Sequence, residues 1–199
     1  MIHISGTSAL VLLWGGKEAY KSKLAQKYLK QIDLSSGKEL FNECNKVWKH
    51  YNEIIRNRKF GVFYIVESIL NDIQEYQIVI LAAGIAPLSL DIIEKFPEAK
   101  VFDIDIENMP MKMKLFEEVS EGSFENRIQF IESDITNKDV LIESLANHGW
   151  DKNKKSIIIA EGISYYITED ELWNIFSLFQ SKDKANFIVL ESLVPYEKF

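Results

Sequence analysis

Cysteine and histidine are scarce in this sequence, and each shortage excludes a class of protein. Cys44 is the single cysteine among 199 residues, so no internal disulfide framework can form, and we expect a reducing, cytoplasmic location. The three histidines, His3, His50 and His148, are far apart and lack the spacing of metal ligands. We therefore predict no metal site, and any chemistry has to come from other side chains.

Long apolar runs are missing as well. The longest stretch, Ile78–Ile93, is interrupted by Gly84, Pro87 and Asp91, which makes it too broken to span a membrane. The N-terminal run Ala9–Trp14 is short and has no Lys or Arg before it, so it does not read as a signal peptide. The sequence therefore predicts no membrane association.

Positive charge is in short supply, with 23 Lys and Arg against 30 Asp and Glu and a net charge of −7. Nucleic-acid-binding surfaces depend on clustered Lys and Arg, so we expect no nucleic-acid partner. The local cluster Lys152, Lys154 and Lys155 is typical of a solvated turn. What remains is an ordinary composition, 47% hydrophobic, at a length that fits one domain with a substantial core.

Short β-branched runs alternate with helical patterns from Gln77 onward. They predict five strands: Ile78–Ala82, Lys100–Ile104, Arg127–Ile131, Ser156–Ala160 and Asn186–Leu190. Helices are predicted at about 86–96, 108–120, 137–147 and 169–180. The last begins with a capping box, Thr168 and Glu171. This alternation implies right-handed βαβ crossovers and an α/β, Rossmann-like sheet that is mainly parallel and covered on both faces.

The first part of the chain has a different pattern, which predicts a helical N-terminal cap over residues 1–76. Its expected helices are Lys17–Lys30, Glu39–Arg58 and Gly61–Asp72, with Ser35–Gly37 as a loop. No linker rich in Gly or Pro separates this cap from the core, residues 77–199, so we predict one structural domain. Phe199 comes nine residues after the fifth strand, and we expect C-terminal strands to be missing relative to related chains. A small five-stranded domain is the alternative.

The residues that follow each strand carry the candidate chemistry, because open parallel sheets bind ligands beyond the carboxyl ends of their strands. Gly84, after the first strand, permits a sharp turn with no Cβ facing a ligand, although many such turns hold a glycine for steric reasons alone. Asp105 ends the second strand, where a carboxylate accepts hydrogen bonds from ribose hydroxyls. The alternative for Asp105 is an acid stabilised by a helix dipole. The spacing of the two residues favours a nucleoside.

The loop Ala82–Pro87 decides between two nucleoside cofactors. A dinucleotide needs a G-x-G-x-x-G turn to hold its pyrophosphate, and here Pro87 even lacks an N–H to donate. S-adenosylmethionine has no phosphate and tolerates this loop. After the third strand, the carboxylate of Asp134 can accept a hydrogen bond from the adenine amino group, and the apolar side chain of Ile135 can pack on the adenine ring. We therefore predict an S-adenosylmethionine site, with a nicotinamide-dependent oxidoreductase as the weaker alternative.

The segment after the fourth strand narrows the prediction to a family. Its residues, Ala160-Glu-Gly-Ile-Ser-Tyr-Tyr-Ile167, resemble the Ala-Glu-Gly-x-x-x-Tyr-Leu signature of the leucine carboxyl methyltransferase family. Four further segments are similar to segments of that family: Arg56–Phe60, Leu81–Ile85, Phe102–Asp105 and Leu190–Pro195. The resemblance spans about residues 40–199.

This resemblance implies an S-adenosylmethionine-dependent O-methyltransferase that acts on a carboxylate of a protein or a small molecule and releases S-adenosylhomocysteine. It also implies that Arg56 binds the methionine carboxylate of the cofactor, with Arg58 as the alternative if the match is shifted. The other implied contacts are Gly84 for the methionine portion, Asp105 for the ribose, Asp134 and Ile135 for the adenine, and Glu161 for the amino end. The neighbouring residues Ala83, Ile106 and Gly162 are implied as cofactor-binding as well.

Tyr166 is the catalytic candidate, because the resemblance puts it near the methyl-transfer channel; simple packing is the alternative for it and for Tyr165. Three residues depart from the family pattern: Gly61 and Ala86 stand where the family has Asp, and Ala82 stands where it has Gly. These departures keep open a second hypothesis, a catalytically degenerate module that retains the fold and binds S-adenosylmethionine.

Overall fold

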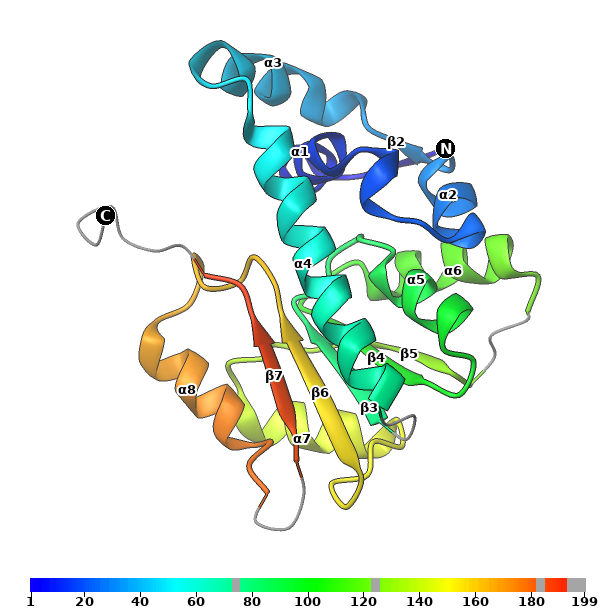
Figure 1. Ribbon diagram of the computed structural model, residues 1–199, viewed down its shortest axis with the longest axis vertical. Helices are drawn as coiled ribbons and strands as arrows, with labels where there is room; N and C mark the ends of the chain where they lie inside the picture. The colour runs from blue at the N-terminus through cyan, green and yellow to red at the C-terminus, as the bar shows by residue number, and fades with distance from the viewer. Residues whose placement is uncertain (73–75, 123–125, 182–184, 193–199) are drawn as a thin grey trace.

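The computed structural model describes residues 1–72, 76–122, 126–181 and 185–192. Within them, five parallel strands form the central sheet in the order β5-β4-β3-β6-β7 (Figure 1). The strands are β3 (Tyr76–Leu81), β4 (Lys100–Asp105), β5 (Ile128–Glu132), β6 (Lys155–Ala160) and β7 (Phe187–Leu190). All five were predicted from the sequence. Chain order runs in opposite directions on the two sides of β3, so the topological switch point lies at its carboxyl end.

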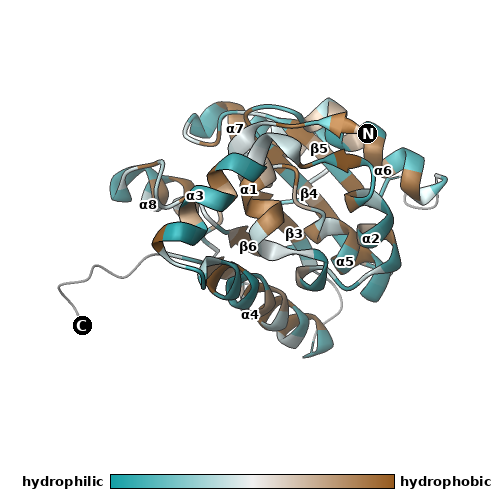
Figure 2. Cartoon of the chain, turned by 90° about the horizontal axis from the view of Figure 1, so that it is seen from above, coloured by the Kyte–Doolittle hydropathy of each residue, from teal (hydrophilic) through white to brown (hydrophobic). Residues whose placement is uncertain are grey.

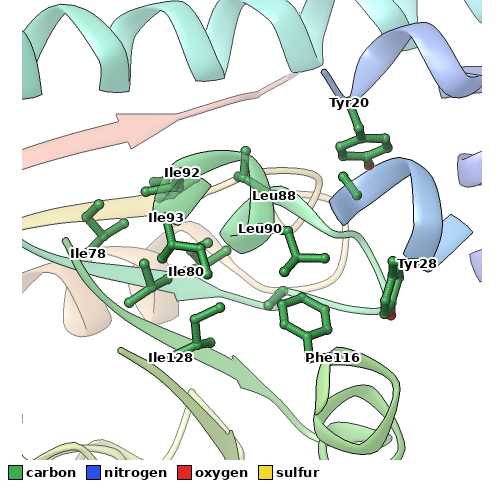
Figure 3. Packing of buried hydrophobic residues seen from close by; sticks show 14 of the residues in the cluster. Tyr20, Tyr28, Ile78, Ile80, Leu88, Leu90, Ile92, Ile93, Phe116 and Ile128 are labelled. Atoms are coloured by element: carbon green, nitrogen blue, oxygen red, sulfur yellow. The ribbon is translucent and has the colours of Figure 1, made fainter. Parts of the chain in front are cut away.

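Helices cover both faces of this sheet and use alternate residues of each strand. One layer contains α5 (Leu88–Lys95) and α6 (Met109–Ser120), packed against Ile78 and Ile80 of β3. Figure 3 shows this layer, including Ile92, Ile93 and Phe116. The opposite layer contains α7 (Lys138–Asn147) and α8 (Glu169–Ser177), packed against side chains that include Val79 and Leu81. Burial on both faces explains why the central strands β3 and β6 contain unbroken apolar runs.

The N-terminal cap is helical, as expected, but its elements differ from those predicted. It contains α1 (Gly6–Gly15), a 3-10 turn η1 (Lys17–Ala19), α2 (Lys23–Leu29), a 3-10 turn η2 (Ser35–Gly37), α3 (Lys38–Val47) and α4 (Tyr51–Asp72). A short parallel pair, β1 (Ile2–His3) and β2 (Ile32–Asp33), accompanies them. Helix α1 and this pair were not predicted. The division of the chain at residues 76 and 77 stays a prediction.

The prediction of a helix break between Arg58 and Gly61 is wrong. Helix α4 runs through both residues, and the break falls earlier, at Trp48, whose backbone is extended. A glycine inside a helix costs only about 1 kcal/mol relative to alanine. The buried stripe of α4, which includes Val62, Val66 and Leu70, outweighs that cost.

The cap is fastened to the sheet layer through the start of α2. Asp91 of α5 accepts hydrogen bonds from the backbone N–H groups of Ser22 at 2.8 Å and Lys21 at 3.2 Å. Burial raises the pKa of this carboxyl group. Tyr28 donates from its hydroxyl to the backbone oxygen of Ile85, 2.9 Å away in the loop after β3. These contacts hold the cap above the carboxyl edge of the sheet (Figure 1). No helix in the described ranges has the length and apolar character that crossing a membrane requires.

Candidate functional site

A cavity of about 760 Å³ opens at the carboxyl ends of β3, β4, β5 and β6. Helix α1 forms its roof, and Figure 2 shows this helix over the strand ends. Of the residues proposed from the sequence, all but Arg56 line the cavity: Arg58, Ala83, Gly84, Asp105, Ile106, Asp134, Ile135, Glu161, Gly162 and Tyr166. The sequence did not point to the roof residues Ser5, Thr7, Ser8, Val11 and Leu12, which also line it. The role of each lining residue stays a prediction.

Hydrogen bonds to Asp105 fix the conformation of the loop after β3. One carboxylate oxygen of Asp105 accepts a hydrogen bond from the N–H of Gly84 at 2.8 Å, and the other accepts from Ile106 N–H at 2.8 Å. Gly84 has a φ of 50°, which favours glycine, and a Cβ placed there would meet no atom within 4 Å. The backbone at Gly84 therefore faces open space inside the cavity, and a ligand can approach it closely.

Asp103 and Asp105 belong to the same side of β4, but only Asp105 lines the cavity. Asp103 is fully buried, and its Oδ2 lies 2.7 Å from Nζ of Lys112 on α6. Ser89 of α5 donates a hydrogen bond to the same oxygen. A buried charge has to be paired in this way to be tolerated. Asp103 therefore ties α5 and α6 to β4 beneath the cavity floor.

The loop after β5 presents Ser133, Asp134 and Ile135 to the cavity. The Oδ1 of Asp134 accepts from the hydroxyl of Thr136 at 2.7 Å and from its N–H at 2.9 Å. These hydrogen bonds lower the pKa of Asp134, which keeps it ionised. Ile135 is buried. The hydroxyl of Ser133 is also buried and makes no hydrogen bond within the described part of the chain. An unsatisfied polar group in a cavity wall is free to serve a ligand.

An ionic cluster forms the opposite end of the cavity, after β6. The Oε1 of Glu161 accepts hydrogen bonds from Arg58 Nε at 3.0 Å and from Lys59 Nζ at 2.9 Å. Burial alone would raise the pKa of Glu161, but the positive charges of Lys59 and Arg58 outweigh it, so the pKa lies below its usual value. Lys59, which also lines the cavity, was not singled out in the sequence.

Glu191, directly after β7, joins this cluster. Its Oε2 accepts from the N–H of Gly162 at 3.0 Å and lies 3.6 Å from Arg58 Nη1. Its Oε1 accepts from the hydroxyl of Tyr165 at 2.7 Å, and burial together with this contact raises the pKa of Tyr165 to about 12. The segment Leu190–Pro195 carried part of the family resemblance, so a signal for Glu191 was present in the sequence. Tyr166 lines the cavity but is 76% exposed, at its mouth.

Arg56 and Arg58 lie on different sides of α4. Residues two apart in an α-helix point about 200° away from each other. Arg58 therefore reaches Glu161, whereas Arg56 does not line the cavity, and its Nε has no hydrogen-bond partner in the described residues. The arrangement favours Arg58 over Arg56 as the arginine available to a ligand. Within the described ranges, His, Cys, Asp and Glu side chains form no group of three or more that could hold a metal ion.

Solved structures share this fold. A DUF574 family protein from Streptomyces avermitilis MA-4680 is 15% identical with a TM-score of 0.63, and a candidate methyltransferase from Thermobifida fusca YX is 14% identical with a TM-score of 0.61. The alignments cover 88% and 81% of this chain but 63% and 62% of those chains, so this chain spans less than two thirds of the length of either. No curated protein matches the sequence.

The family is shown by the sequence of the region that builds the cavity floor and most of its ionic cluster. A family model described as leucine carboxyl methyltransferase matches residues 18–180, which extend from η1 through α8. That range includes Arg58, Gly84, Asp105, Asp134 and Glu161. The chain belongs to the leucine carboxyl methyltransferase family.

Proposed function

We propose that this protein is an S-adenosylmethionine-dependent O-methyltransferase whose acceptor is a carboxylate on a small molecule or a protein. One observation carries the proposal: groups from the ends of four strands and from α4 converge on a single cavity of about 760 Å³. This volume lies within the usual range for small-molecule sites. Family membership supports methyl transfer as the reaction.

The residues present fit the amino-acid end of S-adenosylmethionine. The guanidinium of Arg58 matches a carboxylate with charge-assisted hydrogen bonds, and Glu161 beside it matches an ammonium group. Gly162 has a φ of 71°, and a Cβ there would lie 3.5 Å from Nη2 of Arg58. Gly162 therefore lies in direct contact range of the arginine that we assign to the carboxylate.

The adenosine end fits the loops after β4 and β5. Each oxygen of Asp105 already accepts one backbone N–H and retains a lone pair for a ribose hydroxyl. Asp134 can accept from the adenine amino group, Ile135 offers an apolar surface to the ring, and the unsatisfied hydroxyl of Ser133 supplies a further polar group. Nothing in the loop Ala82–Pro87 resembles the cradle that a pyrophosphate needs.

S-adenosylmethionine would supply an electrophilic methyl group on a positively charged sulfur. A carboxylate acceptor is already ionised at neutral pH, so the protein needs no general base to activate it. This suits a cavity with no histidine among the described residues that line it. The work left to the chain is orientation: Arg58 and Glu161 fix one end of the cofactor, Asp105 fixes the other, and the roof of α1 excludes water.

Isothermal titration calorimetry with S-adenosylmethionine and S-adenosylhomocysteine tests the proposal. We expect saturable one-to-one binding of both, and no change in nicotinamide fluorescence when NADH is mixed with the protein. A folded chain that binds neither sulfur compound would overturn the assignment. A protein that binds NADH and neither sulfur compound would instead be a nicotinamide-dependent oxidoreductase.

A further inference from the structure

Lys59 occupies a position where the helix pattern calls for an apolar residue. The buried residues of α4 are Ile55, Lys59, Val62, Val66 and Leu70, a stripe with helical spacing. Its side chain is only 7% exposed. Removing an ammonium group from water costs several kcal/mol unless it is well paired. An apolar residue would fill this position of α4 without that cost, so packing alone does not explain the lysine.

The pairing of Lys59 is incomplete. Its ammonium has three donors, and the hydrogen bond it makes in the described structure goes to Glu161 Oε1 at 2.9 Å. Tyr20 also lies against this ammonium, with its ring centroid 5.5 Å from Nζ. Burial lowers the pKa of Lys59, but Tyr20 and Glu161 together raise it by more. Glu161 does not depend on Lys59, because Arg58 donates to the same oxygen. With Glu161 on one donor and Tyr20 beside a second, the third donor of Lys59 is left for a ligand at the wall of the cavity.

Its position separates Lys59 from Arg58. A Cβ on Gly15 of α1 would lie 3.7 Å from Cδ and 3.8 Å from Cε of Lys59, so this side chain runs along the roof helix. Arg58 lies beside Gly162 instead. Helix α1 contributes hydroxyl and apolar side chains to the cavity but has no charged residue of its own. Lys59 thereby brings a positive charge to the border of the roof.

The charges of the cluster also point to a negatively charged partner. Arg58 and Lys59 balance Glu161 and Glu191, so these four side chains together are neutral. S-adenosylmethionine carries an ammonium, a sulfonium and one carboxylate, a net charge of +1. Bound beside this cluster, it adds one positive charge next to Arg58 and Lys59, in a partly enclosed cavity where charges interact more strongly than in water. The other charged residues of the lining lie after β4 and β5 or on α6: Asp105 is half-buried, Glu107 and Asp134 are exposed to screening solvent, and Lys112 is buried and paired with Asp103.

We propose that Lys59 determines the specificity for the acceptor: its ammonium receives the carboxylate of the acceptor under α1, while Val11 and Leu12 contact the apolar part next to it. Arg58 is then left to the carboxylate of the cofactor. The inference rests on the proposed function, because it takes a methyl acceptor to be the second ligand of this cavity.

The test compares the affinities of an anion and of a neutral molecule of the same length for the protein with a cofactor analogue already bound. Sodium hexanoate and 1-hexanol are titrated calorimetrically into the protein saturated with sinefungin, in which a protonated amine replaces the methylsulfonium group, and with S-adenosylhomocysteine, which is neutral overall. We expect hexanoate to bind about tenfold or more tightly than hexanol, the effect of one charge-assisted hydrogen bond, and more tightly to the sinefungin complex than to the other.

Lys59→Met keeps the length of the stem and removes the charge. We expect it to abolish the preference for hexanoate while the affinity for S-adenosylhomocysteine changes by less than about threefold, since Arg58 still holds Glu161. Lys27→Met, at an exposed lysine of α2, is the matched control and should change neither quantity.

Two failures are distinguishable. A native chain that binds no S-adenosylhomocysteine contradicts the proposed function. A chain that binds it but takes hexanol as well as hexanoate, or whose Lys59→Met variant keeps the preference, overturns the role of Lys59 alone. If Lys59→Met does not fold, Lys59→Gln is measured in its place, and the native protein must still bind hexanoate more tightly in the sinefungin complex; equal binding there overturns the inference.

Discussion

Arg58 and Glu161 lie 103 positions apart in the sequence and meet across 3.0 Å at the wall of the cavity. The contact joins the longest helix of the cap to the loop after β6. Because Glu191 approaches the same guanidinium from the end of β7, α4 and two strands share one group of charges. The cap therefore supplies part of the site itself, and the relative position of α4 and the sheet sets its geometry.

This ionic contact should make the stability of the fold depend on pH. The pKa of Glu161 is lowered in the folded protein, so its contribution is complete above the ordinary glutamate pKa of about 4.5 and is lost as the pH falls below it. Glu161→Gln should lower the free energy of unfolding by about 1–3 kcal/mol at pH 7, since it leaves two cations without their carboxylate. Urea unfolding at pH 7 and near pH 4 measures both. The difference in the free energy of unfolding between native and variant protein should become smaller at the lower pH. An equal difference at both pH values would mean that Glu161 is not an ionised partner.

The two arginines of α4 offer a matched pair. Arg58→Met should weaken the binding of S-adenosylhomocysteine by roughly 1–3 kcal/mol, because the variant loses a charge-assisted contact to the methionine carboxylate. Arg56→Met removes the same charge from the same helix but from a residue outside the cavity, and should leave the affinity within about twofold. Calorimetric titration of both variants decides between them. The reverse order of effects would restore Arg56 to the role that the family resemblance first suggested.

The central sheet could be predicted because each strand carries its own signal. Strands buried on both faces, such as β3 and β6, are continuous apolar runs, and Thr168 and Glu171 mark the start of α8 by local chemistry. The order of the glycine turn and Asp105 along the chain likewise needs no knowledge of distant contacts. By contrast, β1 and β2 have two residues each and depend on each other, which leaves too little pattern to read.

The ionic cluster could be predicted only in part, because its members come from distant segments. Glu161 stood out in its motif, but its partner Lys59 was hidden by the expected break in α4 after Arg58. With α4 taken as one helix, Lys59 falls inside the stripe from Ile55 to Val62, and its burial becomes visible. In the same continuous helix, Arg56 and Arg58 lie on opposite sides of that buried stripe. One wrong boundary therefore obscured both the lysine and the choice of arginine.

Asp105 should contribute to cofactor binding through its oxygens. Asp105→Asn replaces one acceptor by a donor and removes the charge, and should weaken the binding of S-adenosylmethionine by roughly 1–3 kcal/mol. Asp139→Asn, at an exposed position in the first turn of α7, is the control and should leave the affinity unchanged. Both are measured by calorimetric titration at one ionic strength. Equal affinities in native protein and Asp105→Asn would mean that the ribose binds elsewhere.

Ala82 holds a backbone conformation that suits glycine, the residue that the family has there. Its φ is 52°, and a residue with a Cβ pays roughly 1–2 kcal/mol in this left-handed region. Ala82→Gly removes that strain but adds freedom to the unfolded chain, so the free energy of unfolding should rise by a net of roughly 0.5–1 kcal/mol. Ala86→Gly, in the same loop but without a positive φ, gains no such relief and should lose roughly that amount. Urea unfolding of the two variants compares them directly. If both lose stability, the turn before Gly84 carries no strain, and alanine is as well suited to it as the glycine of the family.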